Sequence, residues 1–397
     1  MDFTFTEEQQ AAVEAARAVF SDVAPDRAPS PALTPGAVAE DIDRPLWNEL
    51  ARTDLLGLTL SPDHGGAGLD PIALCLVLRE SAKVLARVPL LESCAVATAV
   101  QRYGGSTLAA ELLPRAVRGE LILTVGANGR SGHDPAELAV TARPYGENGK
   151  NGANGATGAT GTSAEGSGWV LDGVQSAVPW AQAADWIAIP AHTAGGHPVL
   201  ALLPRDRNGV TLADQVSTSG ERLAEVRLDG ARVGAHELID APGCWEWLRS
   251  LLTTGTCALA LGLGERVLAM TAEYTGKREQ FGFPVATFQA VAVQAADRYI
   301  DLRAMEATLW QAAWRISSDA GGPLPTAADV AVAKIWASDG VRRVVQTAQH
   351  LHGGFGADTD YPLHRFHAWA KQIELSLGPA AAHEESLGDL LAAHPLG

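Results

Sequence analysis

Two changes in the spacing of apolar residues divide this 397-residue chain and most constrain its fold. Up to about residue 119, apolar side chains recur at helical spacing, as in EEQQAAVEAARAVFSDV. From Leu121 to Val233, short runs such as WVLDGVQSAVP and DWIAIPAHT are separated by Gly, Pro, Asp and Asn, which is typical of strands. Helical spacing then returns. We therefore predict an α+β fold with an N-terminal helical domain (1–119), a middle β-barrel or sandwich domain (120–236) and a C-terminal four-helix bundle (237–397).

Local signals place the individual helices. Thr6 and Gln9 form a capping-box pattern ahead of the first helix. Further N-terminal helices are expected at residues 45–53, 71–86, 90–103 and 107–118. The bundle is expected to contain four long segments, at residues 245–281, 288–320, 326–352 and 363–394. Within the β-domain, residues 147–168 form a Gly, Ala, Asn and Thr tract without an apolar face, which predicts a flexible insertion in a hairpin loop.

Charge and cysteine usage restrict the class of protein. The net charge of −16 is spread along the chain and disfavours a nucleic-acid partner, because phosphate binding needs a basic face. The cysteines, Cys75, Cys94, Cys244 and Cys257, lie far apart in apolar runs, which indicates reduced core thiols. The start, MDFTFTEEQQ, is acidic where a signal peptide would be basic. We therefore expect a cytoplasmic location.

Membrane and metal roles lack a sequence signal. The most apolar stretch, residues 257–263, is far shorter than the ~20 residues that cross a bilayer, so we expect a core helix and no membrane insertion. The histidines lack the spacing of metal ligands, and no metal site is predicted.

The stretch from Tyr274 to Gln289, YTGKREQFGFPVATFQ, is the strongest candidate for a binding site. Gly282 and Pro284 interrupt helical sequence and thereby place Arg278 at a break between helices. An arginine offers a fork of donors that suits a phosphate, and Phe281 with Phe288 adds flat apolar surface. A diphosphate-bearing ligand fits this set, although a solvated arginine beside an ordinary turn explains the same residues.

The order RxxFG, Pro and FQ, with Gln289 eleven residues after Arg278, resembles the flavin-binding signature of the acyl-CoA dehydrogenases. Two further stretches resemble that family, LGLTLSPDHGGAGLD in the N-terminal domain and HGGFGADTDYP after the third bundle segment. The resemblance implies FAD as cofactor and an acyl-CoA substrate. It further implies that residues of these motifs reach across a subunit interface to the pyrophosphate and adenine side of a neighbour's FAD. The residues so implied are Arg278, Gln280, Phe281, Gly282, Phe288, Gln289, His350, Gly353, Gly354 and Gly356.

The catalytic base of the family is missing at both positions where members carry it. The base is a glutamate, since burial can raise the pKa of a carboxyl until it accepts a proton near neutral pH. The position directly before the glycine in the last helix is Leu377, and the alternative position in the first bundle helix is Leu252. Leucine carries no proton. The nearby carboxylates Glu246, Glu265 and Glu374 are displaced from these positions and are expected to be solvated surface charges.

The contacts to a subunit's own flavin are also altered. The family's Thr-Glu-Pro is Thr124, Val125 and Gly126 in this chain. The triplet that places a hydroxyl against the flavin ring is Ala177, Val178 and Pro179. Proline has neither a hydroxyl nor a backbone donor, so those hydrogen bonds are lost.

The residues that differ from the family are therefore those that the resemblance assigns to a subunit's own flavin and substrate site. The residues that are retained are those that it assigns to a neighbour's FAD. This asymmetry suggests a subunit that completes a partner's FAD site and has no catalytic base of its own. The C-terminal sequence is similar to actinobacterial members that act on CoA thioesters of steroid side chains, in which two kinds of subunit form a heterotetramer. The resemblance implies a second acyl-CoA dehydrogenase subunit as partner and an electron-transfer flavoprotein as electron acceptor.

Three alternatives stay open. The first is a self-sufficient homomeric dehydrogenase with a displaced base, Glu246 or Glu374. The second is a flavin monooxygenase on the same fold, which needs no carboxylate base. The third is a structural CoA-binding protein without flavin.

Overall fold

The structure is a computed structural model that describes residues 4–31, 33–132, 134, 137–146, 168–318 and 320–394. The insertion predicted at residues 147–168 lies outside the described residues, except for Gly168, which begins strand β3.

The N-terminal part is helical, as predicted. Its helices are α1 (Glu7–Phe20), α2 (Arg44–Arg52), α3 (Pro71–Ala82), α4 (Leu90–Tyr103) and α5 (Ser106–Val117). The capping box at α1 is confirmed, since the Gln9 amide N–H donates to Thr6 Oγ1 (3.2 Å) and the Thr6 amide N–H donates to Gln9 Oε1 (2.9 Å). Helix α3 ends at Ala82, before the predicted boundary at residue 86.

The middle part is one eight-stranded mixed sheet, in the order β6-β7-β3-β2-β4-β5-β8, with β1 pairing parallel to β4. The strands are β1 (Leu123–Val125), β2 (Val140–Tyr145), β3 (Gly168–Pro179), β4 (Trp186–Thr193), β5 (Pro198–Pro204), β6 (Val210–Val216), β7 (Arg222–Gly234) and β8 (Leu238–Ile239). Strands β5 and β7 are not neighbours in this order but contact one another, so the sheet curls around its own apolar core. The predicted α+β class is confirmed.

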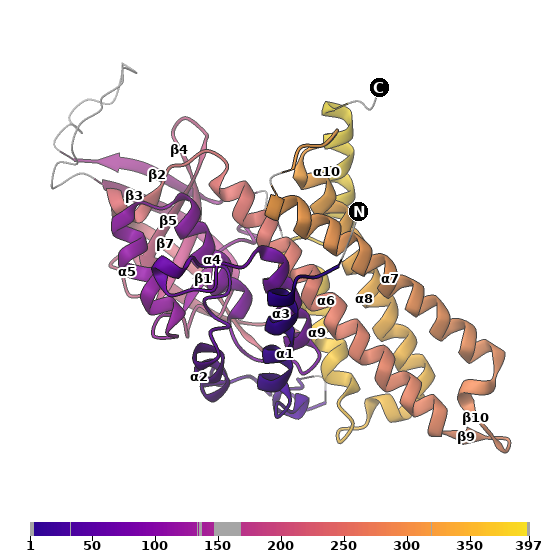
Figure 1. Cartoon of the computed structure of the whole chain (residues 1–397). Coiled ribbons are helices and arrows are strands. Elements are labelled where there is room, and N and C mark those ends of the chain that lie inside the picture. Colours follow the sequence, from indigo (N-terminus) through magenta and orange to yellow (C-terminus); the bar gives the residue numbers. More distant parts are fainter. Residues whose placement is uncertain are drawn as a thin grey trace.

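The C-terminal part contains α6 (Cys244–Lys277), α7 (Gln289–Ser318), α8 (Thr326–His352), α9 (Leu363–Leu375) and α10 (Ala380–Ala393). Helices α6, α7 and α8 lie side by side (Figure 1). Between α6 and α7, strands β9 (Glu279–Gln280) and β10 (Phe283–Pro284) form a hairpin at the end of the bundle farthest from the large sheet (Figure 1). One apolar core runs through the N-terminal helices and the bundle.

The fourth bundle segment is broken, which corrects the prediction of a continuous segment at residues 363–394. Helix α9 ends at Leu375, and α10 begins at Ala380. Leu377 (φ 57°) and Gly378 (φ 93°) adopt left-handed backbone conformations, which an α-helix does not contain. The fully buried Lys334 of α8 donates to the carbonyl oxygens of Ile373 (3.1 Å) and Glu374 (3.0 Å) and so satisfies the end of α9.

Helix α6 is the central element of the bundle. By length and composition it could cross a membrane, yet 78% of its most apolar window is buried inside the protein, as in the core helix predicted here. It lies very close to α3, because a Cβ on Gly262 would stand 1.9 Å from the Arg79 carbonyl oxygen. The cysteines are all buried and free.

Candidate functional site

The predicted flavin-contact residues lie at the far end of the bundle, on the hairpin, at the start of α7, near the end of α8 and in the loop after it, and all but Gly356 are exposed. Arg278 follows the last residue of α6, and its backbone N–H donates to the Tyr274 carbonyl oxygen (2.8 Å). Phe281 (φ 55°) and Gly282 (φ 83°) form the hairpin turn, with positive φ at both central positions as a tight two-residue turn requires. Helix α6 therefore ends at Lys277, earlier than the sequence predicted.

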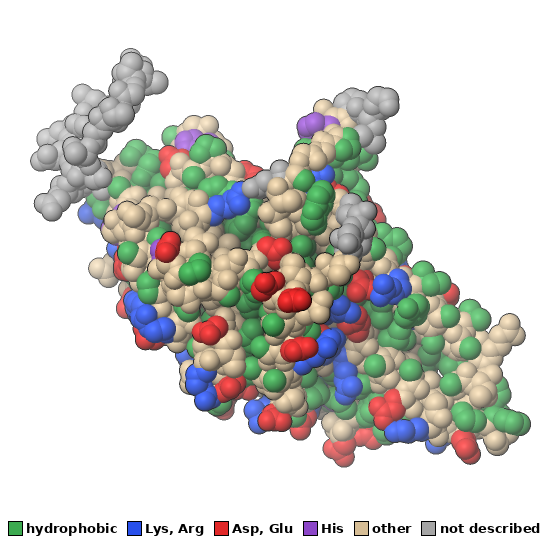
Figure 2. All heavy atoms as spheres, in the orientation of Figure 1, with side chains coloured by type: hydrophobic (Ala, Val, Ile, Leu, Met, Phe, Trp, Pro, Cys, Tyr) green, Lys and Arg blue, Asp and Glu red, His purple; other side chains and the backbone are tan. Residues whose placement is uncertain are grey.

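Phe281 is held in an unfavourable place for an aromatic residue. A positive φ is strained for a bulky side chain, and 90% of the Phe281 surface is exposed. Its ring and that of Phe288 form a T-shaped pair, with ring centroids 6.4 Å apart. Strain of this kind persists where a function requires it. Hydrophobic side chains also gather along the nearby edge of α7 (Figure 2), where Val293 and Ile300 are exposed.

The polar groups of this region have few internal partners. Arg278 and Gln289 are exposed, and neither side chain makes a hydrogen bond or ion pair with another described residue. Gln280 differs, since its side-chain amide donates to the Glu279 carbonyl oxygen (2.8 Å). His350, near the end of α8, is exposed. The unpaired guanidinium and amide remain available to an outside acceptor.

The glycines after α8 fall into two kinds. A Cβ on Gly353 or Gly354 would meet no atom within 4 Å, so packing inside this chain does not require glycine there. Gly353 nevertheless has a φ of 59° with ψ at −137°, a backbone conformation that favours glycine. Gly356 is buried, and a Cβ there would lie 2.9 Å from the Gln349 side chain. Packing within this chain therefore explains a glycine at position 356 but does not explain Gly354.

An aromatic stack joins the hairpin region to this glycine loop. Tyr274 stacks on His352 (4.4 Å between centroids) and on Phe355 (5.2 Å). His352 Nε2 is hydrogen-bonded to Tyr361 Oη (3.1 Å), and burial lowers the pKa of His352, so the ring is neutral at pH 7. A cavity of about 350 Å³ beside the stack is lined in part by Tyr274, Arg278 and Tyr361. The sequence contained these aromatic residues without indicating that they meet.

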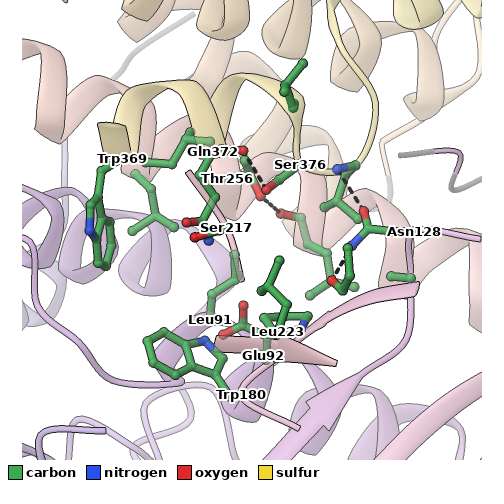
Figure 3. Close-up of a pocket in the computed structure, with 18 of the residues that line it drawn as sticks. Leu91, Glu92, Asn128, Trp180, Ser217, Leu223, Thr256, Trp369, Gln372 and Ser376 are labelled. Atoms are coloured by element: carbon green, nitrogen blue, oxygen red, sulfur yellow. Dashed lines mark hydrogen bonds between the residues drawn. The ribbon is translucent and has the colours of Figure 1, made fainter. Parts of the chain in front are cut away.

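The second region is an inner cavity of about 350 Å³ between the N-terminal helices, the sheet and the bundle (Figure 3). Leu252 of α6 and Leu377 of the α9–α10 connection both line it, as does Pro179 at the end of β3. The two alternative positions of the family's base therefore meet at one cavity, and both carry leucine.

The polar groups next to these leucines are used within the chain. The Leu377 backbone N–H donates to Asn128 Oδ1 (3.1 Å), and Asn128 Nδ2 donates to the Ala177 carbonyl oxygen (3.2 Å). Thr124 Oγ1 donates to the Pro179 carbonyl oxygen (2.6 Å). These hydroxyl and amide groups are consequently not free donors for a flavin ring.

Glu92, in the first turn of α4, is the functional candidate that the sequence analysis missed. Its carboxyl lines the inner cavity and lies beside the Trp180 indole (Figure 3). Burial raises the pKa of Glu92 to about 7, although the Glu92 backbone N–H and the Trp180 indole act in the opposite direction. A signal was present, since Glu92 is the single charged residue in the apolar run VPLLESCAVATAV.

The carboxylates considered as displaced bases lie outside the inner cavity. Glu246 is exposed, as predicted. The prediction of solvated surface charges is wrong for the other two. Glu374 has a side chain only 13% exposed and pairs with Lys371 (2.7 Å). Glu265 accepts a hydrogen bond from Arg79 Nε (2.9 Å) and is 23% exposed. Helix packing also brings an arginine from a neighbouring helix to each: Arg342 of α8 lies 3.9 Å from Glu374, and Arg79 of α3 pairs with Glu265 of α6.

No group of three or more His, Cys, Asp or Glu side chains that could hold a metal ion occurs in the part of the chain that the structure describes.

Comparison with known proteins agrees with this architecture. Residues 6–120 match the acyl-CoA dehydrogenase N-terminal domain, and residues 252–391 match the acyl-CoA dehydrogenase C-terminal domain. The chain is 35% identical to acyl-CoA dehydrogenase FadE27 of Mycobacterium tuberculosis over 89% of both chains. Among solved structures, it is similar to a variant of the Tcur3481-Tcur3483 steroid ACAD (TM-score 0.84, 35% identity, 98% of each chain). It is also similar to the ChsE4-ChsE5 complex from M. tuberculosis (TM-score 0.85, 33% identity, 100% of each chain).

This chain belongs to the acyl-CoA dehydrogenase family, whose members bind FAD. The two regions differ in how well they suit that cofactor. The first region, which comprises the β9–β10 hairpin, the start of α7 and the glycine loop after α8 and is called the hairpin region below, fits the cofactor. The unpaired guanidinium of Arg278 suits a diphosphate, and the unpaired amide of Gln289 and the open backbone at Gly354 suit an adenine. The inner cavity fits poorly beside the ring-contact triplet, since Pro179 has no N–H and Thr124 spends its hydroxyl on Pro179.

Proposed function

We propose that this chain is a subunit of a heteromeric FAD-dependent acyl-CoA dehydrogenase, in which it completes the partner's FAD site and supplies no catalytic base. The observation that carries the proposal is the meeting of Leu252 and Leu377 at one cavity. Either position could serve a dehydrogenase, because either side chain would enter the same space. Because both positions carry leucine, the inner cavity has no glutamate at either position from which family members take the substrate proton.

The hairpin region supplies the other half of the argument. Arg278 and Gln289 face solvent without partners in the described chain, and Phe281 is exposed at a strained turn. These exposed groups make no stabilising contact within the described chain. In an assembly, the same groups could bind a ligand held by a neighbouring subunit, and strained residues cluster at such functional sites. We assign Arg278 to the diphosphate of the partner's FAD, and His350, Gly353 and Gly354 to its adenine side.

FAD supplies the oxidising group, which accepts hydride from the acyl chain. This chain's own residues act by position. The guanidinium of Arg278 would neutralise the diphosphate and fix it by two-point hydrogen bonding. The hairpin holds Arg278 at that place, because the Arg278 carbonyl oxygen accepts a hydrogen bond from the Val285 N–H (2.7 Å).

Two related structures support the proposal of a substrate and a partner. One is described as a steroid ACAD and another as a complex of two chains. We accordingly propose a CoA thioester of a steroid side chain as substrate, a second acyl-CoA dehydrogenase subunit as partner and an electron-transfer flavoprotein as acceptor. A cytoplasmic location and the domain boundaries at residues 119 and 236 stay predictions.

Flavin content per chain tests this proposal. The chain would be purified alone and again after co-expression with a candidate partner acyl-CoA dehydrogenase subunit. We expect flavin in about half of the chains, and only in a mixed tetramer. A homotetramer of this chain that is saturated with FAD and oxidises an acyl-CoA would overturn the proposal.

Glu92 favours one second candidate, the self-sufficient dehydrogenase. A carboxyl with a pKa raised to about 7 in the inner cavity has the protonation behaviour of a general base. That function requires flavin in the isolated chain and loss of acyl-CoA oxidation in Glu92→Gln. Activity that survives Glu92→Gln would exclude Glu92 as the base.

A further inference from the structure

The inner cavity has one ionisable side chain, and it is not part of the family's catalytic set. Of the described residues that line the cavity, Glu92 alone can carry a charge. The remaining lining is largely apolar, with Leu78 and Leu91 from α3 and α4, and Leu252 and Ile373 from α6 and α9. A volume of about 350 Å³ is within the range of small-molecule sites. Ordinary protein interiors hold few voids larger than a water molecule.

The cavity reaches the surface. Val216 and Thr218, beside the turn between β6 and β7, line it and are exposed. Leu375, at the end of α9, lines it from another side and is 42% exposed. A molecule therefore has a route inward that does not cross the packed core.

Trp180 and Glu92 form a built polar pair on one wall. Trp180 has a φ of 58°, a strained conformation for an indole side chain, and its indole lies beside the Glu92 carboxyl (Figure 3). In Figure 3 the Glu92 carboxyl points into the cavity beside this indole, and Gln372 of α9 lies on the opposite side. The backbone is thus held in a strained state that places an indole and a carboxyl together at the cavity wall.

The charge of the pair selects the kind of ligand. No lysine, arginine or histidine is present among the described lining residues, so nothing in the cavity compensates an anionic ligand. Near neutral pH the Glu92 carboxyl exists in both protonation states, because burial raises its pKa to about 7. A hydroxyl can donate to the ionised carboxylate and accept from the protonated acid. An ammonium group pairs with only one of these states.

We propose that the inner cavity of this chain binds a neutral, largely apolar alcohol, with the Glu92 carboxyl as its hydrogen-bonding anchor, independently of flavin. This proposal does not depend on the partner role of the hairpin region. It assigns a ligand to the cavity in which the chain has lost the family's base.

Calorimetric titration of the full chain with three compact probes tests this site. The probes are adamantanol, adamantylamine and adamantane carboxylate, which share one apolar body and differ in the polar group. We expect saturable binding of adamantanol at one site per chain, about tenfold or more tighter than either charged probe, as the loss of one buried hydrogen bond predicts.

Two kinds of variant test the Glu92 hydrogen bond and the cavity volume separately. Glu92→Leu is expected to weaken adamantanol binding about tenfold, and Glu92→Gln is expected to retain it, because an amide both donates and accepts. Leu252→Trp should abolish binding of every probe by filling the cavity. Glu246→Gln, at an exposed carboxylate outside the cavity, is the matched control and should bind as the parent chain does. The melting transition of each variant confirms that it is folded.

Three results of these titrations would overturn the proposal. They are the absence of saturable adamantanol binding, a preference for adamantylamine, and binding that Glu92→Leu and Leu252→Trp leave unchanged. Purification of the isolated chain with flavin that adamantanol does not displace would likewise refute a flavin-independent site.

Discussion

At the scale of single residues, Glu92 couples the inner cavity to the stability of the fold. Burial raises its pKa from an ordinary value near 4.5 to about 7, so the folded chain holds this proton more tightly than the unfolded chain. The protonated folded state is therefore favoured, and the stability contributed by Glu92 is fully present below pH 4.5. It falls as pH rises and is lost above about pH 7.

Glu92→Gln removes this titration and predicts a pH-dependent gain in stability. The variant should match the parent chain near pH 4.5 and exceed it well above pH 7 by about 3 kcal/mol in free energy of unfolding, from a pKa shift of roughly 2.5 units. Urea denaturation of the variant and the parent chain at a series of pH values measures the difference in free energy of unfolding. Other titrating groups, such as His383, contribute equally to both proteins and cancel in that difference. A pH-independent difference would show that Glu92 is ordinarily solvated.

Lys334 supports a different prediction at this scale. Its ammonium donates to Ser338 Oγ (2.8 Å) and to two carbonyl oxygens at the end of α9. Lys334→Met preserves the volume and leaves those oxygens without a donor, which should lower the free energy of unfolding by about 1–3 kcal/mol. Lys277→Met, at a lysine that is 76% exposed and pairs only with an exposed glutamate, is the control and should change stability by less than about 0.5 kcal/mol. Equal stability of Lys334→Met and the parent chain would contradict this role.

At the scale of elements, the contact between α3 and α6 depends on a missing side chain. A Cβ on Gly262 would overlap the Arg79 carbonyl oxygen, which is backbone and cannot rotate away. The two helices are therefore as close as their backbones allow, and this contact joins the N-terminal helices to the bundle.

Two glycine substitutions in the same helix test that contact. Gly262→Ala should destabilise the chain by about 3 kcal/mol or more, because α3 and α6 must move apart. Gly276→Ala should be neutral or stabilise by up to about 1 kcal/mol, since its Cβ meets no atom within 4 Å and alanine favours helix. Thermal unfolding of both variants measures the contrast. A similar effect of the two would mean that α3 and α6 are not in close contact.

The break between α9 and α10 shows what local pattern leaves undecided. Apolar spacing continues through residues 363–394 and predicted one segment. Leu377, Gly378 and Pro379 form a turn there. Lys334 binds the carbonyl oxygens just before it, and Asn128 accepts from the Leu377 N–H within it. Those partners come from α8 and from the loop after β1, so only the folded chain supplies them.

At the scale of the whole molecule, the hairpin region gives the sharpest prediction about assembly. In a mixed tetramer with the partner, Arg278→Ala is expected to weaken FAD binding at least about tenfold, the effect of losing a charge-assisted contact to a phosphate. Arg278→Lys should recover part of the loss, because it keeps the charge and loses the two-point geometry. Flavin absorbance after dialysis measures both.

Arg266 provides the matched control for that experiment. It is also exposed on α6 but does not line the cavity beside the aromatic stack. Arg266→Ala should leave flavin content unchanged. Equal flavin in Arg278→Ala and Arg266→Ala would refute the assignment of Arg278 to the partner's cofactor.

The sequence by itself determined the order of helical and strand segments, the family motifs and the leucines at both base positions. These features are local, since the periodicity of apolar residues and the spacing of a motif are properties of neighbouring residues. Only the tertiary structure decided that Leu252 and Leu377 share a cavity, that Glu92 enters it, and that Tyr274, His352 and Phe355 form a stack. Each of these contacts joins elements far apart in the chain. Their meeting depends on how close α3, α6, α9 and the sheet can pack, which no local pattern encodes.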